Sequence, residues 1–205
     1  FPKLLYFLDE NNTYPGSKYH WLTKLAAEST ALRMNPDVIS VKKMKQLHGY
    51  AFPPMGCRAF LSMFYDENNK PIFYGRGNLG VCSINLPYAA LESGGDIYKF
   101  WDILDEKLEL ARQVCELRYE KLRGVKANIA PILWQHGAIA RLKPDDDILK
   151  AIDERGFTVT IGYSGIYETV KYLTGKSHTT EEGFALAEKI MKYLRDTLLI
   201  FKEKQ

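Results

Sequence analysis

The sequence predicts an α/β fold, in which short buried strands alternate with amphipathic helices. An apolar run at residues 4–8 precedes a helical pattern, and a β-branched run follows at residues 38–41. A further strand-like run at residues 157–161 again precedes a helical pattern. Because a strand–helix–strand unit joins parallel neighbours, we expect a parallel sheet.

The first helix is expected over residues 17–34, with Ser17 as a candidate N-cap and Asn35-Pro36 as its stop. The spacing of its apolar residues indicates one buried face. The residues expected on that face are Trp21, Leu22, Leu25 and Ala26.

A hairpin is expected next, because a strand-like run at residues 60–65 is followed by turn residues and a second run at residues 72–74. Another strand is expected over residues 81–86, ended by Pro87. The sequence therefore predicts one α/β unit with an inserted hairpin.

A long amphipathic helix is expected over residues 96–122. Its predicted apolar stripe consists of Ile97, Phe100, Trp101, Leu104, Leu108, Ala111, Val114, Cys115 and Leu117.

Three elements are expected in the last third of the chain. Acidic residues 145–147 favour the start of a short helix that closes at Gly156, because carboxylates suit the positive end of the helix dipole. After the strand at residues 157–161, a tight turn at residues 162–165 leads into a second helix. A capping box, Thr179 to Glu182, predicts a final helix to about residue 202.

Composition excludes several classes of protein. Hydrophobic residues make up 46% of the 205 residues, which predicts a packed core. A net charge of +3 and short apolar runs give no reason to expect nucleic-acid binding or a membrane span. The three cysteines form no C-x-x-C pair and the four histidines show no ligand spacing, so we expect a reducing cytoplasm and no metal site. Because the chain begins with Phe1 in a strand-like run, we expect a piece of a longer protein.

Two short motifs allow more than one interpretation. Residues 75–80 match G-x-G-x-x-G, but the following segment is strand-like, whereas a dinucleotide-binding loop needs a helix there. We therefore interpret them as a glycine-rich bend. Ser164, in Gly-Tyr-Ser-Gly, resembles a hydrolase nucleophile, although Ile166 breaks the full pattern. The same turn could bind an anion at the helix start or only form a sharp corner.

Cys57 differs from the other two cysteines. Cys82 and Cys115 fall in apolar strand and helix patterns, and we interpret them as small core residues. Cys57 follows residues 53–56, where two prolines restrict the backbone and a glycine permits a close turn. Such a loop can hold one side chain in a fixed place, so Cys57 is a candidate catalytic residue, with an inert thiol as the alternative.

Three ordered stretches together resemble one family. They are residues 55–61 (MGCRAFL), 75–87 (GRGNLGVCSINLP) and 161–168 (IGYSGIYE). With the opening FPKLLYFLDE, they are similar to the anaerobic, oxygen-sensitive class of ribonucleotide reductase, a glycyl radical enzyme.

The resemblance implies a fold and a reaction. The fold is a ten-stranded α/β barrel of the glycyl radical enzyme type, with a central finger loop that carries Cys57. Residues 1–205 would be a single piece of this catalytic barrel, without the N-terminal regulatory cone and the C-terminal glycyl radical domain. The reaction would reduce ribonucleoside triphosphates to deoxyribonucleotides for DNA synthesis. A thiyl radical on Cys57 would abstract the 3′ hydrogen of the ribose, and the 2′ hydroxyl would leave as water.

The resemblance also implies site residues and partners. Asn78 is expected to be catalytic and to hydrogen-bond the substrate or formate, the implied reductant. Because backbone N–H groups at a helix start can bind an anion, Ser164 and Gly165 are expected to face the substrate's phosphates. No cofactor is expected within residues 1–205, while a glycyl radical and a zinc site are expected in a C-terminal part. A radical-SAM activating enzyme and a second copy in a homodimer are the implied protein partners.

The chain departs from the family pattern in ways that leave alternatives open. It has no glycyl radical motif and no cysteine cluster for zinc, and neither Cys82 nor Cys115 matches the family's second cysteine. The piece alone is therefore expected to be inactive. The alternatives are a non-enzymatic nucleotide-binding or dimerising α/β fragment and a serine hydrolase that uses Ser164.

Overall fold

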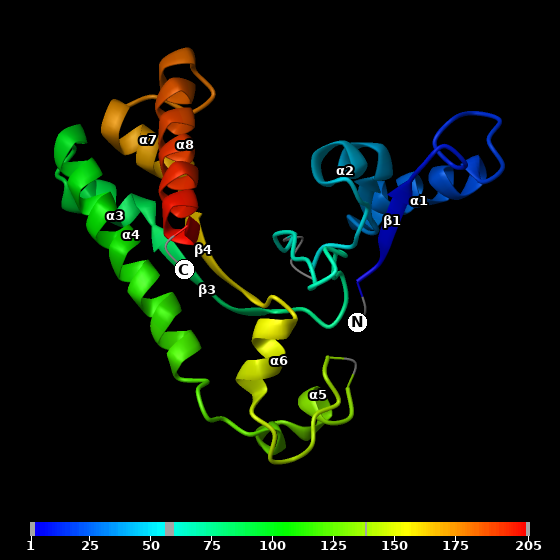
Figure 1. The fold of residues 1–205 in the computed structure, drawn as a ribbon. Helices are drawn as coiled ribbons and strands as arrows, with labels where there is room; N and C mark the ends of the chain where they lie inside the picture. The colour runs from blue at the N-terminus through cyan, green and yellow to red at the C-terminus, as the bar shows by residue number, and fades with distance from the viewer. Residues whose placement is uncertain (1–2, 56–59, 138, 204–205) are drawn as a thin grey trace. The chain divides into compact units, whose positions relative to one another are not determined.

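The computed structural model describes residues 3–55, 60–137 and 139–203, and within these ranges the chain is built from helices and two small parallel sheets (Figure 1). The predicted α/β class is therefore confirmed. The chain divides into two compact units, Phe1–Tyr74 and Gly75–Gln205. Each unit has its own sheet and its own core.

The first unit contains one parallel pair of strands. Its described elements are β1 (Leu5–Leu8), α1 (His20–Arg33), β2 (Asp37–Ser40) and α2 (Val41–His48). Strands β1 and β2 pair in parallel, with Leu5 opposite Asp37 and Leu8 opposite Ser40, as the strand–helix–strand pattern predicted.

Helix α1 begins later than predicted and buries less. The Ser17 hydroxyl donates to the carbonyl of Tyr14 (2.7 Å) in a turn, so the prediction of Ser17 as the N-cap was wrong. Trp21 and Leu25 are 62% and 53% exposed, and Ala26 is the buried residue of this helix. Helical spacing shows which residues share a face, but not whether a neighbour covers that face.

Two other predictions for this unit were wrong in detail. Helix α2 was not predicted, because Val41 prolongs a β-branched run; the Ser40 side chain accepts from the Lys43 N–H (3.2 Å) and starts the helix. The predicted hairpin at residues 60–74 reduces to one antiparallel bridge, Tyr65 with Pro71, around a turn. A two-stranded hairpin is only marginally stable without further strands, which accounts for the difference.

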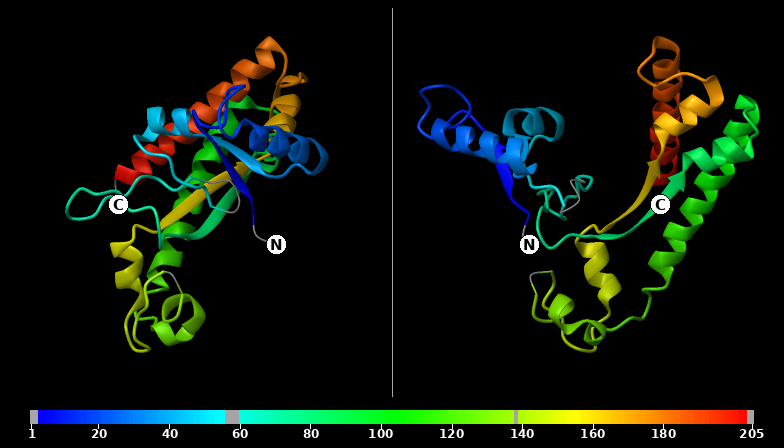
Figure 2. Two further views of the ribbon diagram at one scale, coloured as in Figure 1. Left: turned by 90° about the vertical axis from the view of Figure 1, so that its right-hand side faces the viewer. Right: turned by 180° about the vertical axis from the view of Figure 1, so that it is seen from behind.

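The second unit contains the other parallel pair. Its described elements are β3 (Asn78–Asn85), α3 (Leu86–Glu92), α4 (Ile97–Glu120), η1 (Ala127–Ile129), α5 (Pro131–Trp134), α6 (Ile148–Glu154), β4 (Thr158–Ser164), α7 (Ile166–Thr174) and α8 (Glu181–Glu203). Strands β3 and β4 run side by side in parallel, far apart in sequence (Figure 2). The G-x-G-x-x-G stretch leads into β3 and not into a helix, so it is not a dinucleotide-binding loop. The chain bends at Gly75, but Asn78, Leu79 and Gly80 already belong to β3, so the interpretation as a bend is confirmed only at its start.

Helix α4 packs against this pair and supplies much of the core. Phe100 and Leu104 are fully buried, together with Ile190 of α8, and Ile84 of β3 belongs to the same core cluster. The predicted stripe is confirmed at its centre, but Leu117 is 56% exposed. Asp96 accepts from the N–H groups of the first turn and caps α4.

The predicted start of α6 was correct, whereas the predicted start of α8 and the predicted end of β4 were displaced. Asp147 accepts from the Leu149 N–H (2.9 Å) and caps α6, which confirms the acidic helix start. Helix α8 is capped by Thr180, which accepts from the Gly183 N–H (3.2 Å), so the capping box assigned to Thr179 was off by one residue. Strand β4 continues to Ser164, beyond the predicted end. No helix of the described residues is long and apolar enough to cross a membrane.

Candidate functional site

One side of the β3–β4 pair is a polar face. Directly opposite residues of paired strands project to the same side of a sheet. On β3, Cys82 and Ile84 pack toward the core, whereas Val81, Ser83 and Asn85 are exposed. We define the polar face by its polar side chains, which are Asn78, Ser83, Asn85, Thr158, Thr160 and Ser164.

Asn78 lies at the start of this face and is held by three hydrogen bonds. Its side-chain nitrogen Nδ2 donates to Oγ1 of Thr158 (3.2 Å) and to Oγ1 of Thr160. Its oxygen Oδ1 accepts from the Gly80 N–H (2.8 Å). The register of β3 against β4 shifts between Asn78 and Val81. Within this irregular stretch, the Asn78 side chain accepts the hydrogen bond of the Gly80 backbone N–H.

Two arginines that the sequence analysis did not single out fix the backbone around Asn78. Arg76 donates through Nε to the carbonyl of Arg155 (3.0 Å) and through Nη2 to that of Gly156 (2.8 Å), at the negative end of α6. Burial lowers the pKa of the Arg76 guanidinium. Arg118 of α4 donates to the Val81 carbonyl (3.0 Å). The stretch that carries Asn78 is therefore tied to two helices.

Ser164 and Gly165 lie at the other end of the polar face. Ser164 is exposed and pairs with Asn85, whose side chain caps α3. Gly165 adopts a positive φ of 83°, and a Cβ there would lie 2.2 Å from Cγ of Pro87. Glycine is therefore required for the chain to leave β4 and enter α7.

The surroundings of Ser164 bear on two of its predicted roles, anion binding at the helix start and nucleophilic catalysis in a hydrolase. The first turn of α7 offers backbone N–H groups, but it also contains the carboxylate of Glu168. No histidine among the described residues hydrogen-bonds Ser164, so these residues do not form the Ser–His pair that the hydrolase alternative would use.

Asn78 and Ser164 share a face but not a pocket. Asn78 is opposite Thr158, and Ser164 lies six residues further along β4. At roughly 3.3 Å per strand residue, the two ends are about 20 Å apart. One small molecule such as formate cannot contact both, whereas a long ligand lying along the strands could approach each in turn.

The cysteines divide as the sequence analysis expected, as far as the structure describes them. Cys115 is buried in α4, and Cys82 is partly buried against the core cluster that contains Ile84 and Leu104. Burial raises the pKa of the Cys115 thiol, with a smaller effect from nearby Cys82. Both thiols are free, and they fit the prediction of small core residues. Cys57 lies outside the described residues.

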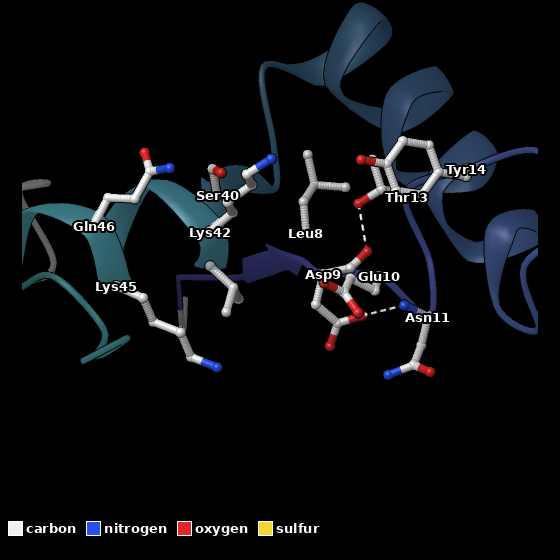
Figure 3. A pocket seen from close by; sticks show the side chains of 11 residues that line it. Leu8, Asp9, Glu10, Asn11, Thr13, Tyr14, Ser40, Lys42, Lys45 and Gln46 are labelled. Carbon is white, nitrogen blue, oxygen red and sulfur yellow. Dashed lines mark hydrogen bonds between the residues drawn. The ribbon is translucent and has the colours of Figure 1, made fainter. Parts of the chain in front are cut away.

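The first unit contains a cavity that the sequence analysis did not predict. It lies at the carboxyl ends of β1 and β2 and has a volume of about 810 Å³ (Figure 3). Its charged lining residues are Asp9, Glu10, Lys42 and Lys45. The Asp9 carboxylate already accepts from the Asn11 N–H (2.7 Å), which shapes the loop after β1. Because the charges are mixed, the cavity does not favour one ligand class.

Comparison with known proteins decides the family. The family model for anaerobic ribonucleoside-triphosphate reductase matches residues 1–205. The chain belongs to this family. The resemblance that the three ordered stretches indicated is therefore confirmed.

Relatives within the anaerobic ribonucleoside-triphosphate reductase family cover most of this chain. The protein of that name from Salmonella typhimurium is 40% identical over 198 residues, 93% of this chain. The Escherichia coli protein is 39% identical over the same length, and that of Enterobacteria phage T4 is 43% identical over 176 residues, 82% of this chain. The chain spans 28% of the length of the two bacterial relatives and 29% of the phage protein.

Proposed function

We propose that this chain forms part of the catalytic barrel of an anaerobic ribonucleoside-triphosphate reductase. The match of the reductase family model to the whole chain carries the proposal. The second unit supports it, because α4 covers one side of the β3–β4 pair and leaves the polar face open. In a closed α/β barrel, helices lie outside the strands, so this polar face would line the interior.

The proposed reaction takes place at the Cys57 sulfur. As a thiyl radical, Cys57 would take the 3′ hydrogen atom of the ribose and return a hydrogen atom after the 2′ hydroxyl has left as water. S–H and activated C–H bonds are close in strength, so the exchange is nearly balanced. This chemistry uses the thiol rather than the thiolate, so a low pKa is not required. An enclosed barrel interior would exclude water and oxygen from the radical.

Formate would supply the two electrons of the reduction and be oxidised to carbon dioxide. We propose that Asn78 helps to bind formate or the substrate, because its side chain lies on the polar face and is held rigidly there. We further propose that the substrate's phosphates approach Ser164 and Gly165, where α7 begins. The nucleotide would then lie along the strands.

The cofactors and partners implied by the family involve other parts of the protein. Within the described residues, no group of three or more His, Cys, Asp or Glu side chains could hold a metal ion. We assign no described residue to the zinc site, and we propose, as the family resemblance implies, that the zinc and the glycyl radical belong to a C-terminal part. The radical-SAM activating enzyme, the homodimer and the cytoplasmic location remain predictions.

Substitution of Cys57 in the full-length reductase tests the proposal. We expect Cys57→Ala to abolish nucleotide reduction, because no other group of the chain is proposed to exchange the ribose hydrogen. Cys82→Ala is the matched control, since Cys82 packs against the core, and it should retain turnover. Sustained deoxyribonucleotide formation by Cys57→Ala would rule out the assignment. Labelling of Ser164 by a fluorophosphonate would instead favour the hydrolase alternative.

A further inference from the structure

We propose that Thr158 and Thr160 are positioning residues for Asn78, which fix the direction of its carboxamide within the active site. The inference rests on the proposed function, in which Asn78 binds formate or the substrate. It follows from the contact between Asn78 Nδ2 and the two threonine hydroxyls.

The direction of the carboxamide is determined by its third partner. The two ends of an Asn side chain are similar in shape, so its orientation must be deduced from its hydrogen bonds. The backbone N–H of Gly80 can only donate, and it lies 2.8 Å from the side chain of Asn78. The atom that faces Gly80 must therefore be the oxygen, and the amino group must face Thr158 and Thr160.

This orientation determines what the site can offer to a ligand. Each threonine hydroxyl accepts a hydrogen bond from Asn78, so its own hydrogen must point elsewhere. Within the described parts of the chain, neither hydroxyl donates to another side chain or carbonyl. The two N–H bonds of Asn78 Nδ2 are both used in these contacts, so Asn78 itself offers a ligand the remaining lone pair of Oδ1. That lone pair suits a hydroxyl donor, such as a ribose hydroxyl of the substrate.

The side chains of Thr158 and Thr160 have little conformational freedom. They alternate on β4 with Val159 between them, so both project to the same side of the strand. Their branched side chains have few rotamers in a strand, and both residues are partly buried. A valine has nearly the same shape and lacks the hydroxyl, so Thr→Val removes the hydrogen bonds with little change in packing.

A double-mutant cycle in the full-length, activated reductase tests the inference. We expect Thr160→Val to lower kcat/KM roughly five- to tenfold, the effect of about one hydrogen bond, and Thr160→Ser to restore most of it. Asn78→Ala should lower kcat/KM roughly a hundredfold. Because Thr160 acts through Asn78, the combined variant should be no worse than Asn78→Ala.

The controls separate positioning from stability. Thr174→Val removes a hydroxyl that donates to the Val170 carbonyl at the far end of α7, and it should leave kcat/KM unchanged. Melting temperatures identify variants that lose the fold. Thr158→Val, combined with Asn78→Ala, provides a second, independent double-mutant cycle. A rise confined to KM for the nucleotide would support positioning and identify the ligand as the substrate, whereas a rise confined to KM for formate would contradict it.

The results that would overturn the inference also show which role is lost. Full activity of Thr160→Val and Thr158→Val beside an impaired Asn78→Ala would remove the positioning role and leave the role of Asn78 intact. Additive losses in the combined variant would do the same, because they indicate that the threonines act independently of Asn78. Full activity of Asn78→Ala would remove the proposed role of Asn78 and the positioning role with it.

Discussion

The hydroxyl of Tyr119 on α4 donates to the carboxylate of Asp153 on α6 over 2.6 Å. This bond needs the phenol proton, so it raises the pKa of Tyr119 to about 12, with smaller contributions from burial and the Asp153 charge. A tyrosine in an unfolded chain titrates near about 10. The bond therefore stabilises the fold below about pH 10, and this contribution is lost as the pH rises toward about 12.

We expect Tyr119→Phe to lower the free energy of unfolding by about 1 kcal/mol or less at pH 8, because the pair is exposed to solvent. The difference should shrink between about pH 10 and 11, where the unfolded chain begins to ionise. Urea unfolding of the 205-residue chain across this range measures it. Tyr98→Phe is the control, since Tyr98 is 82% exposed on the same helix. A difference that stays constant with pH would contradict the explanation.

At the scale of elements, one glycine controls how α7 follows β4. Gly165 has a φ of +83°, and its missing Cβ leaves room for the Pro87 ring. We expect Gly165→Ala to destabilise the second unit by about 2–4 kcal/mol, from backbone strain plus the clash. Thermal or urea unfolding provides the measurement.

Gly175 is a matched control at the other end of α7. It also has a positive φ, +72°, but nothing lies within 4 Å of a Cβ built there. Gly175→Ala should therefore show the backbone strain alone, about 1–2 kcal/mol. Equal losses in the two variants would mean that the contact with Pro87 contributes nothing.

The elements that sequence patterns predicted well are those determined by local signals. Helix α4 combines an Asp96 cap with a long apolar stripe, and α6 begins at the Asp147 cap. The exposed Trp21 and the reduced hairpin at residues 60–74 depend instead on which neighbours cover a face or extend a sheet. Spacing along the chain contains no information on such neighbours.

The candidate site was also only partly predictable. Asn78 came from a family resemblance and Ser164 from the Gly-Tyr-Ser-Gly turn, and their shared face required the register of β3 against β4. Thr158 and Thr160 gave no signal of their own, because threonines are common in strands. Their importance arises from a contact between residues 80 and 82 positions apart in the sequence.

At the scale of the whole chain, the two units differ in how much apolar surface they bury. The first unit has a core cluster of Ile39, Met44 and Phe52. The second has a larger one around α4 and α8, in which Phe100, Leu104 and Ile190 are completely buried. Because hydrophobic burial is the main favourable contribution to folding, local stability should differ between the units.

Hydrogen exchange of the 205-residue chain should reveal this difference. We expect the amides of α4 to exchange most slowly, since they open only with the larger core, and those of α1 to exchange orders of magnitude faster, since Ala26 is the buried residue of that helix. Phe100→Ala should speed exchange in α4, because it leaves a cavity that costs about 3–5 kcal/mol. Equal protection of α1 and α4 would mean that burial in each unit does not set its stability, and that contacts absent from the described cores hold α1 in place.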